Sequence, residues 1–255
     1  MKLVDFIRSM DELYPRALSC DWDTDGLQLL VDPDRELKRV LVTLDAGYPE
    51  ACAAADGGYD LLLTHHPLIF GGTREITPTS VPGNRILKLI GAGVSAASYH
   101  TRLDAGSGGV NDCLAKALDI TNTEPFGDSE MPNGGRIADI SETTAGSLAE
   151  LAKVRLNSPS VKLSGDPKKP VRRVAIIGGA GKDFIIPALR AGADAIITGE
   201  ASYSSAHDLS EYGIAIIEAG HFHTEFPVTE RLAALVREIA GACADIRRFD
   251  KQTVI

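Results

Sequence analysis

The sequence is poor in cysteine, and its cysteines form no motif. Its 255 residues include four, Cys20, Cys52, Cys113 and Cys243, which lie far apart without a CxxC pair. This spacing points to neither a disulfide framework nor a cysteine metal site. We interpret all four as reduced thiols on apolar helix faces. Together with the lack of a signal-peptide pattern, this cysteine usage predicts a cytoplasmic protein.

Long hydrophobic runs and an excess of basic residues are also missing. No window approaches the roughly 20 apolar residues of a membrane span, so we expect no membrane association. The chain carries 26 Lys and Arg against 35 Asp and Glu, a formal net charge of −9. A nucleic-acid surface needs clustered basic residues, so we expect no nucleic-acid partner. A small anionic substrate remains compatible with this charge, because a bound metal reverses the local field.

The order of predicted elements favours an α/β protein. Short apolar runs bounded by turn residues predict strands, and amphipathic or Ala-rich stretches predict helices. These alternate along most of the chain, which favours mixed or parallel sheets flanked by helices. The predicted strands span residues 39–45, 60–64, 94–99, 171–177, 195–198 and 214–218. The predicted helices span residues 2–14, 49–56, 82–91, 108–118, 147–156, 183–191, 204–212 and 224–240.

A turn-rich stretch interrupts this alternation. Residues 121–135 contain two prolines and three glycines, a composition that is typical of a domain boundary. The alternation of strands and helices resumes after it. Two α/β units therefore follow one another in the chain.

Five of the six histidines lie in three segments of the same form. Each segment is a predicted strand, then a tight loop with metal-ligand residue types, then a helix. Because open α/β sheets place ligand sites at the carboxyl ends of their strands, we expect these side chains to converge at one edge of the sheet. The segments carry His65 and His66; His100 and Asp104; and His221, His223 and Glu225.

This residue set predicts a metal site. Imidazole and carboxylate ligands together suit Zn, Fe, Mn, Co or Ni, and we place Zn and Fe first. The alternative, an ordinary core or surface histidine, is the better interpretation for any one histidine alone, but a weaker one for five in equivalent places. Five ligands exceed the needs of one open catalytic site, which predicts two divalent ions about 3.5–4 Å apart, bridged by a group such as Glu225. The predicted ligands are His65, His66, Asp104, His221 and Glu225.

Three further features allow more than one interpretation. Gly106 and Gly108-Gly109 precede a helix, where free N–H groups would favour an anion or where a tight turn needs positive φ. Residues 178–183 contain glycines without phosphate-loop spacing, which indicates a strand-to-helix turn, with anion binding as the lesser alternative. Glu200 is either an outer partner of the site, a substrate contact or a solvated loop acid. His207 fits an ordinary helix surface.

Several of these stretches resemble a known family, the dinuclear metal-centre proteins called GTP cyclohydrolase 1 type 2 homologues, or Nif-three-like proteins. The resemblance spans nearly the whole chain, in the family's order. It is specific as a combination. The matching stretches are residues 21–28, 64–67, 100–105 with 108–112, 198–200, and 219–221 with 224–225.

The resemblance implies two similar α/β domains, a metal pair in the cleft between them, and a toroidal homohexamer. We predict the domains as residues 1–124 with 226–255 and residues 125–225. By motif, the implied ligands are the same five residues, and His100 is a further ligand or a substrate contact. This chain departs from the family pattern at Thr24, Asp25 and Ser204, and it lacks the large insertion of longer members.

The predicted function is metal-dependent hydrolysis. Two metals would activate water for attack on an electrophile. The resemblance implies a GTP-like purine nucleotide, and phosphoester hydrolysis uses the same metals. The alternative is a metal-handling or regulatory scaffold protein without turnover. A purely structural metal site is a third interpretation, disfavoured by ligands that lie on loops.

Overall fold

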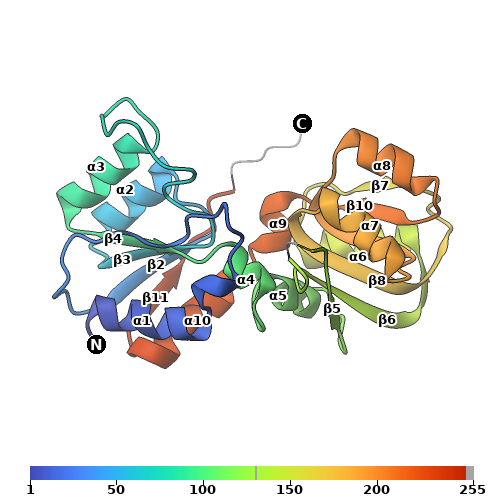
Figure 1. Cartoon of the computed structure of the whole chain (residues 1–255), viewed down its shortest axis with the longest axis horizontal. Coiled ribbons are helices and arrows are strands. Elements are labelled where there is room, and N and C mark those ends of the chain that lie inside the picture. The colour runs from blue at the N-terminus through green and yellow to red at the C-terminus, as the bar shows by residue number, and fades with distance from the viewer. Residues whose placement is uncertain (130, 251–255) are drawn as a thin grey trace. The chain divides into compact units, whose positions relative to one another are not determined.

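The computed structural model in Figure 1 describes residues 1–129 and 131–250, with only the backbone of Leu209. The chain forms two compact units. Unit 1 consists of residues 1–103 and 228–250, and unit 2 consists of residues 104–227. Among the described residues, no helix combines the length and the apolar character that crossing a membrane requires.

Unit 1 contains a five-stranded sheet in the order β1-β4-β3-β2-β11. All neighbouring strands are parallel except β1, which runs antiparallel to β4. In the register of this sheet, Thr43 lies beside Thr64, and Thr64 beside Ser98. The loops after these residues therefore leave the same edge of the sheet. The strands are β1 (Gly26–Leu29), β2 (Arg39–Thr43), β3 (Leu61–Thr64), β4 (Ser95–Ser98) and β11 (Cys243–Ile246).

Helices cover both faces of this sheet. Figure 1 shows α2 and α3 on one face and α1 and α10 on the other. Leu62 packs in one cluster with Ala51 of α2 and Leu89 of α3. Burial on both faces explains the uninterrupted apolar run of β3. The helices are α1 (Leu3–Leu13), η1 (Arg16–Leu18), α2 (Tyr48–Asp56), α3 (Gly83–Ala92) and α10 (Val228–Ala240), and α4 (Thr101–Ala105) carries the chain into unit 2.

Unit 2 contains a six-stranded mixed sheet in the order β5-β6-β8-β9-β10-β7. Its centre, β8-β9-β10, is parallel, while β5, β6 and β7 pair antiparallel. The α/β class and the mixed sheets predicted from the sequence are thereby confirmed. The strands are β5 (Glu124–Phe126), β6 (Gly135–Thr144), β7 (Lys162–Ser164), β8 (Pro170–Ala180), β9 (Ala195–Glu200) and β10 (Ala215–Glu218).

The second sheet is also covered on both faces. Val174 and Ile176 of β8 join one hydrophobic cluster with α5 and α6. Ala175 and Ile177, which point the opposite way, join another with α7 and α8. Both faces of β8 are thus core. The helices are α5 (Val110–Ala117), α6 (Ala145–Arg155), η2 (Lys182–Phe184), α7 (Ile185–Arg190), α8 (Tyr203–Ser210) and α9 (His221–Glu225).

Besides the strands that were not predicted, two features differ from the sequence predictions. The single helix predicted over 224–240 is two helices, α9 and α10, which are separated at Phe226-Pro227. Proline lacks the N–H that a continuing helix would use, and its ring crowds the preceding turn. The division between units falls after Leu103 and not after residue 124. The reason is that Leu114 of α5 belongs to the hydrophobic cluster of the second sheet. The predicted bounds of independently folding domains stay a prediction.

Asp60, the residue before β3, connects the start of β3 to the start of β2. Its carboxylate accepts the backbone N–H groups of Lys38 and Arg39, both at 2.8 Å, and Arg35 Nε at 2.7 Å. Burial alone would raise the pKa of Asp60, but these hydrogen bonds outweigh burial and lower it. A carboxyl with a lowered folded-state pKa adds stability above its unfolded pKa, and that stability is lost as the pH falls through the folded value.

We therefore expect Asp60→Asn to lower the free energy of unfolding by about 1–3 kcal/mol at neutral pH, because a buried acceptor is weakened. The difference from wild type should shrink below about pH 4, where the wild-type carboxylate also begins to protonate. Urea unfolding followed by the fluorescence of Trp22, the only tryptophan, measures this. Glu36→Gln, at an exposed neighbouring carboxyl, is the control. A difference independent of pH would contradict the assignment.

Candidate metal centre

Three histidines gather at the carboxyl edge of the unit 1 sheet. His65 and His66 follow β3 directly, and His100 follows β4 after Tyr99. The ring centroids are 4.9 Å apart for His65–His66, 5.2 Å for His65–His100 and 5.6 Å for His66–His100. One nitrogen from each ring lies within 4.8 Å of the other two, a spacing that could hold a metal ion. Because neighbouring strands are parallel, the fold itself brings the three together.

Each of these rings is held through Nδ1. His65 Nδ1 lies 2.9 Å from the carbonyl oxygen of Tyr99. A carbonyl only accepts, so Nδ1 carries the proton, and in the neutral ring Nε2 keeps its lone pair. His66 Nδ1 lies 2.8 Å from Asp45 Oδ1, and His100 Nδ1 lies 3.0 Å from an oxygen of Asp23. Carbonyl or carboxylate partners at one ring nitrogen are typical of histidines that bind metal through the other.

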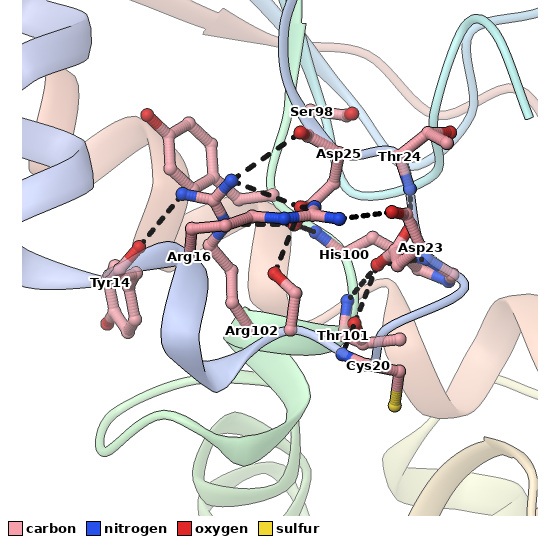
Figure 2. A network of polar contacts seen from close by, with 12 residues as sticks. Tyr14, Arg16, Cys20, Asp23, Thr24, Asp25, Ser98, His100, Thr101 and Arg102 are labelled. Atoms are coloured by element: carbon pink, nitrogen blue, oxygen red, sulfur yellow. Dashed lines mark hydrogen bonds and ion pairs between the residues drawn. The ribbon is translucent and has the colours of Figure 1, made fainter.

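Asp23 holds the His100 ring as a buried anion. Besides His100, its carboxylate accepts Thr101 Oγ1 at 2.6 Å and the Thr101 N–H at 3.1 Å (Figure 2). Burial alone would raise the pKa of Asp23, but the hydrogen bonds from His100 and Thr101 outweigh burial and lower it. Asp23 and Asp45 were not among the predicted site residues. Asp45 could have been found from the sequence, because it is the last residue of a predicted strand and therefore lies at the same edge of the sheet.

A buried ion pair lies behind the His100 loop. The side chain of Arg102 is 3% exposed, and its guanidinium donates to Asp25 from Nε at 3.0 Å (Figure 2). Asp25 also accepts the backbone N–H of His100 at 2.9 Å and the guanidinium of Arg16 at 2.5 Å. Asp25, one of the departures from the family pattern, thus connects the start of α4 to the loop before β1. Ser204, another departure, lies on α8 and has no such role that we can identify.

In unit 2, His221 and Glu225 stand at the two ends of α9. They are four residues apart and therefore share one face of the helix. His221 Nε2 lies 3.0 Å from Glu225 Oε2, and His221 Nδ1 lies 3.0 Å from Glu200 Oε1. Glu200 is thus an outer partner of His221, which is one of the roles considered from the sequence. Asp104, the remaining predicted ligand, is in α4, where its carbonyl oxygen accepts Asn111 Nδ2 at 3.4 Å.

Three glycines make room for α9. A Cβ on Gly179, which has φ +65°, would overlap Glu225 Oε1, and a Cβ on Gly178 would lie 3.2 Å from Glu225 Cγ. A Cβ on Gly199 would lie 2.7 Å from the Cα of His221. The sequence interpretation of residues 178–183 as a simple turn is therefore incomplete. β8 continues to Ala180, and its glycines form part of the seat for the candidate ligands.

The anion site considered before α5 is not supported. The N–H of Gly108 donates to Asp112 Oδ2 at 2.6 Å, and the N–H of Gly109 donates to the carbonyl oxygen of Gly106 at 3.1 Å. Asp112 is in turn paired with Arg136 at 2.5 Å. The chain's own carboxylate thus lies where an anion was expected. Gly108 has φ +70°, which agrees with the alternative interpretation, a tight turn.

The expectation that all three segments leave one sheet is wrong. The unit 1 histidines follow β3 and β4, whereas His221 and Glu225 follow β10 of the other sheet. Each unit therefore carries its own group of candidate ligands. His223 is buried beside Phe222, with ring centroids 5.7 Å apart. His207 is exposed on α8 beside Asp208, as the sequence indicated.

Known proteins resemble this chain over almost its full length. It is 33% identical to a "GTP cyclohydrolase 1 type 2 homolog" of Clostridium perfringens, covering 93% of this chain and 92% of that one. A protein of the same description from Streptomyces coelicolor is 32% identical, with coverage of 99% and 92%. The crystal structure of a Staphylococcus aureus hypothetical protein superposes with a TM-score of 0.91 at 26% identity, covering 100% and 99%. The family model for Duf34/NIF3 (NGG1p interacting factor 3) matches residues 1–251, and the chain belongs to this family.

Proposed function

We propose that this protein is a metal-dependent hydrolase with two divalent ions. The proposed ligands are His65, His66, Asp104, His221 and Glu225. One observation carries the proposal: His65, His66, His100 and His221 all have Nδ1 beside a carbonyl or carboxylate oxygen. That arrangement orients a ring for metal binding through Nε2.

The donor chemistry fits such ions. Imidazole nitrogens and carboxylate oxygens suit Zn and Fe, and also Mn, Co or Ni. The imidazoles of unit 1 supply neutral donors, while Glu225 and Asp104 supply the negative charge that offsets part of a divalent cation. His100, close to both other rings of its cluster, is a further ligand or a contact for the substrate.

Divalent ions in this setting supply Lewis acidity, which activates water and polarises an electrophile. The chain's own groups orient the ligands. Asp45 and the Tyr99 carbonyl fix the rings of His66 and His65, and Glu200 fixes His221. Of the two proposed carboxylate ligands, Glu225, with its side chain 6% exposed, is better shielded from bulk water than the half-buried Asp104. Such a group would bridge two cations, as we propose.

The proposed substrate class is a purine nucleotide of the GTP type, because the curated relatives carry the name GTP cyclohydrolase 1 type 2 homolog. In the corresponding reaction, two water molecules hydrolyse the two C8–N bonds of the purine, and C8 leaves as formate. Phosphoester hydrolysis is the neighbouring reaction. A toroidal homohexamer and a cytoplasmic location complete the proposal and stay predictions.

Elemental analysis of the purified protein, combined with a mass measurement and assays for formate and phosphate release from GTP, tests the proposal. We expect about two transition-metal ions per chain, a mass near six chains, and turnover that chelation abolishes. Full metal content without turnover across a nucleotide and phosphoester panel would instead assign the metal-handling scaffold function. Protein that binds no metal after reconstitution would contradict both.

A further inference from the structure

Two exposed aromatic rings touch each other on unit 1. Trp22, the only tryptophan of the chain, is 54% exposed, and Phe70 is 61% exposed. Their ring centroids lie 5.9 Å apart at an interplanar angle of 64°. Scattered apolar residues on a surface need no explanation, but two large rings in contact leave apolar area in water that a ligand can cover.

This pair borders the histidine cluster. The centroid of His100 lies 6.1 Å from that of Trp22 and 6.1 Å from that of Phe70. His100 is in turn 5.2 Å from His65. A ligand that reaches the histidines can therefore cover the aromatic pair without leaving unit 1.

The loops that carry the two rings are fastened together. Thr24 Oγ1 donates to the carbonyl oxygen of Ile69 at 2.9 Å, and Gln28 Nε2 donates to the same oxygen at 2.7 Å. The N–H of Ile69 donates to Gln28 Oε1 at 3.2 Å. Trp22 precedes Asp23, and Phe70 follows Ile69, so both rings stand next to anchored positions. Loops that are already ordered lose less entropy when they bind a ligand.

We propose that Trp22 and Phe70 bind the planar heteroaromatic ring of the substrate, with the purine base as its class. This inference deepens the proposed function and rests on it. The two rings meet edge to face, so the base would stack on an exposed ring face and not between them. Stacking suits a base because every base offers a flat π-face, whatever its substituents. A phosphate or a bare sugar has no π-face to stack on these two rings.

Trp22 reports on its own ligand, since no other tryptophan contributes fluorescence. Guanosine 5′-monophosphate should quench this fluorescence saturably in the full-length protein with its metal content measured. Ribose 5-phosphate, which has the same phosphate and sugar but no base, should leave it unchanged. Equal effects of the two probes would overturn the proposal, because the phosphate would then account for binding.

Variants locate the effect on the two rings. By calorimetry, Trp22→Leu and Phe70→Leu should each weaken binding of guanosine 5′-monophosphate about tenfold, with metal content unchanged. Tyr48→Leu, at an exposed aromatic residue on α2, is the matched control and should bind as wild type. Unchanged affinity in both leucine variants would overturn the proposal.

Two further outcomes separate this inference from the proposed function. Metal-loaded protein that turns over GTP while its Trp22 is not quenched overturns the ring inference alone. Saturable, Phe70-dependent quenching in protein that binds no metal even after reconstitution supports the ring inference and counts against the metal proposal.

If acrylamide fails to reach Trp22 in wild type and Phe70→Ser lowers the oligomeric mass, the pair is an interface between copies and the inference is overturned.

Discussion

Replacing His66 by alanine is expected to weaken divalent-metal binding by about 100-fold or more. Loss of an outer partner of a ligating histidine typically lowers metal affinity about 10- to 100-fold, and loss of the ligand itself removes more. Because His66 is only half-buried, the fold should survive the substitution. Equilibrium dialysis against zinc, followed by elemental analysis, measures the affinity, and circular dichroism confirms the fold.

Asp45→Asn should weaken metal binding less than His66→Ala does. Asp45 touches the His66 ring at Nδ1 and is not a proposed ligand, so its loss should weaken binding by about 10- to 100-fold, less than His66→Ala. Asp56→Asn, at an exposed carboxyl paired with Lys88, removes the same charge from unit 1 and should leave the affinity unchanged. If all three variants bind zinc as wild type, His66 is not a ligand and the proposed centre is wrong.

Arg102→Met is expected to lower the free energy of unfolding by about 3 kcal/mol. Removing one partner of a buried ion pair leaves the other charge without compensation, which typically costs about 3–5 kcal/mol. The lower value applies because Arg16 still faces Asp25 at 2.5 Å. Methionine keeps the apolar stem of the arginine, so the change reports mainly on the charge. Urea unfolding followed by Trp22 fluorescence is the measurement.

Neutralising the partner should restore part of this loss. The double variant Asp25→Asn/Arg102→Met leaves no uncompensated charge from this pair, and we expect it to be about 1–2 kcal/mol more stable than Arg102→Met. Arg8→Met, at an exposed pair with Asp5, should change stability by less than about 1 kcal/mol. A double variant that is less stable than Arg102→Met would show that Asp25 acts through other partners.

The fold was predictable where burial is strong and local. The run Leu61–Leu63 is buried on both faces, so its composition alone identified β3. The strands that were missed have weaker patterns. β6 is buried in its first half and mostly exposed in its second, and its paired residues in β8 lie 26 to 40 positions further along the chain, from Thr144 with Pro170 to Arg136 with Ile176. No local window contains the information for such a pairing.

The candidate centre was predictable in its donors but not in their supports. Histidine and carboxylate side chains at strand ends identify themselves by type and place. The contact between His66 and Asp45 joins two different loops, and only the parallel pairing of β2 with β3 brings those loops together. The same holds for Asp23, which reaches His100 across a long stretch of sequence. The assignment of the ligands to two sheets also needed the strand order.

The three glycines that make room for α9 have a consequence for protein design. Copying His221, Glu225 and Glu200 onto another α/β protein would reproduce every donor and still fail, because ordinary side chains would occupy the volume that Gly178, Gly179 and Gly199 leave open. In this part of the molecule, the absence of a side chain at three positions is as necessary as the presence of the donors. A search for functional positions by their reactive groups passes over these glycines. A single added methyl at Gly179 would nevertheless collide with the carboxylate of Glu225.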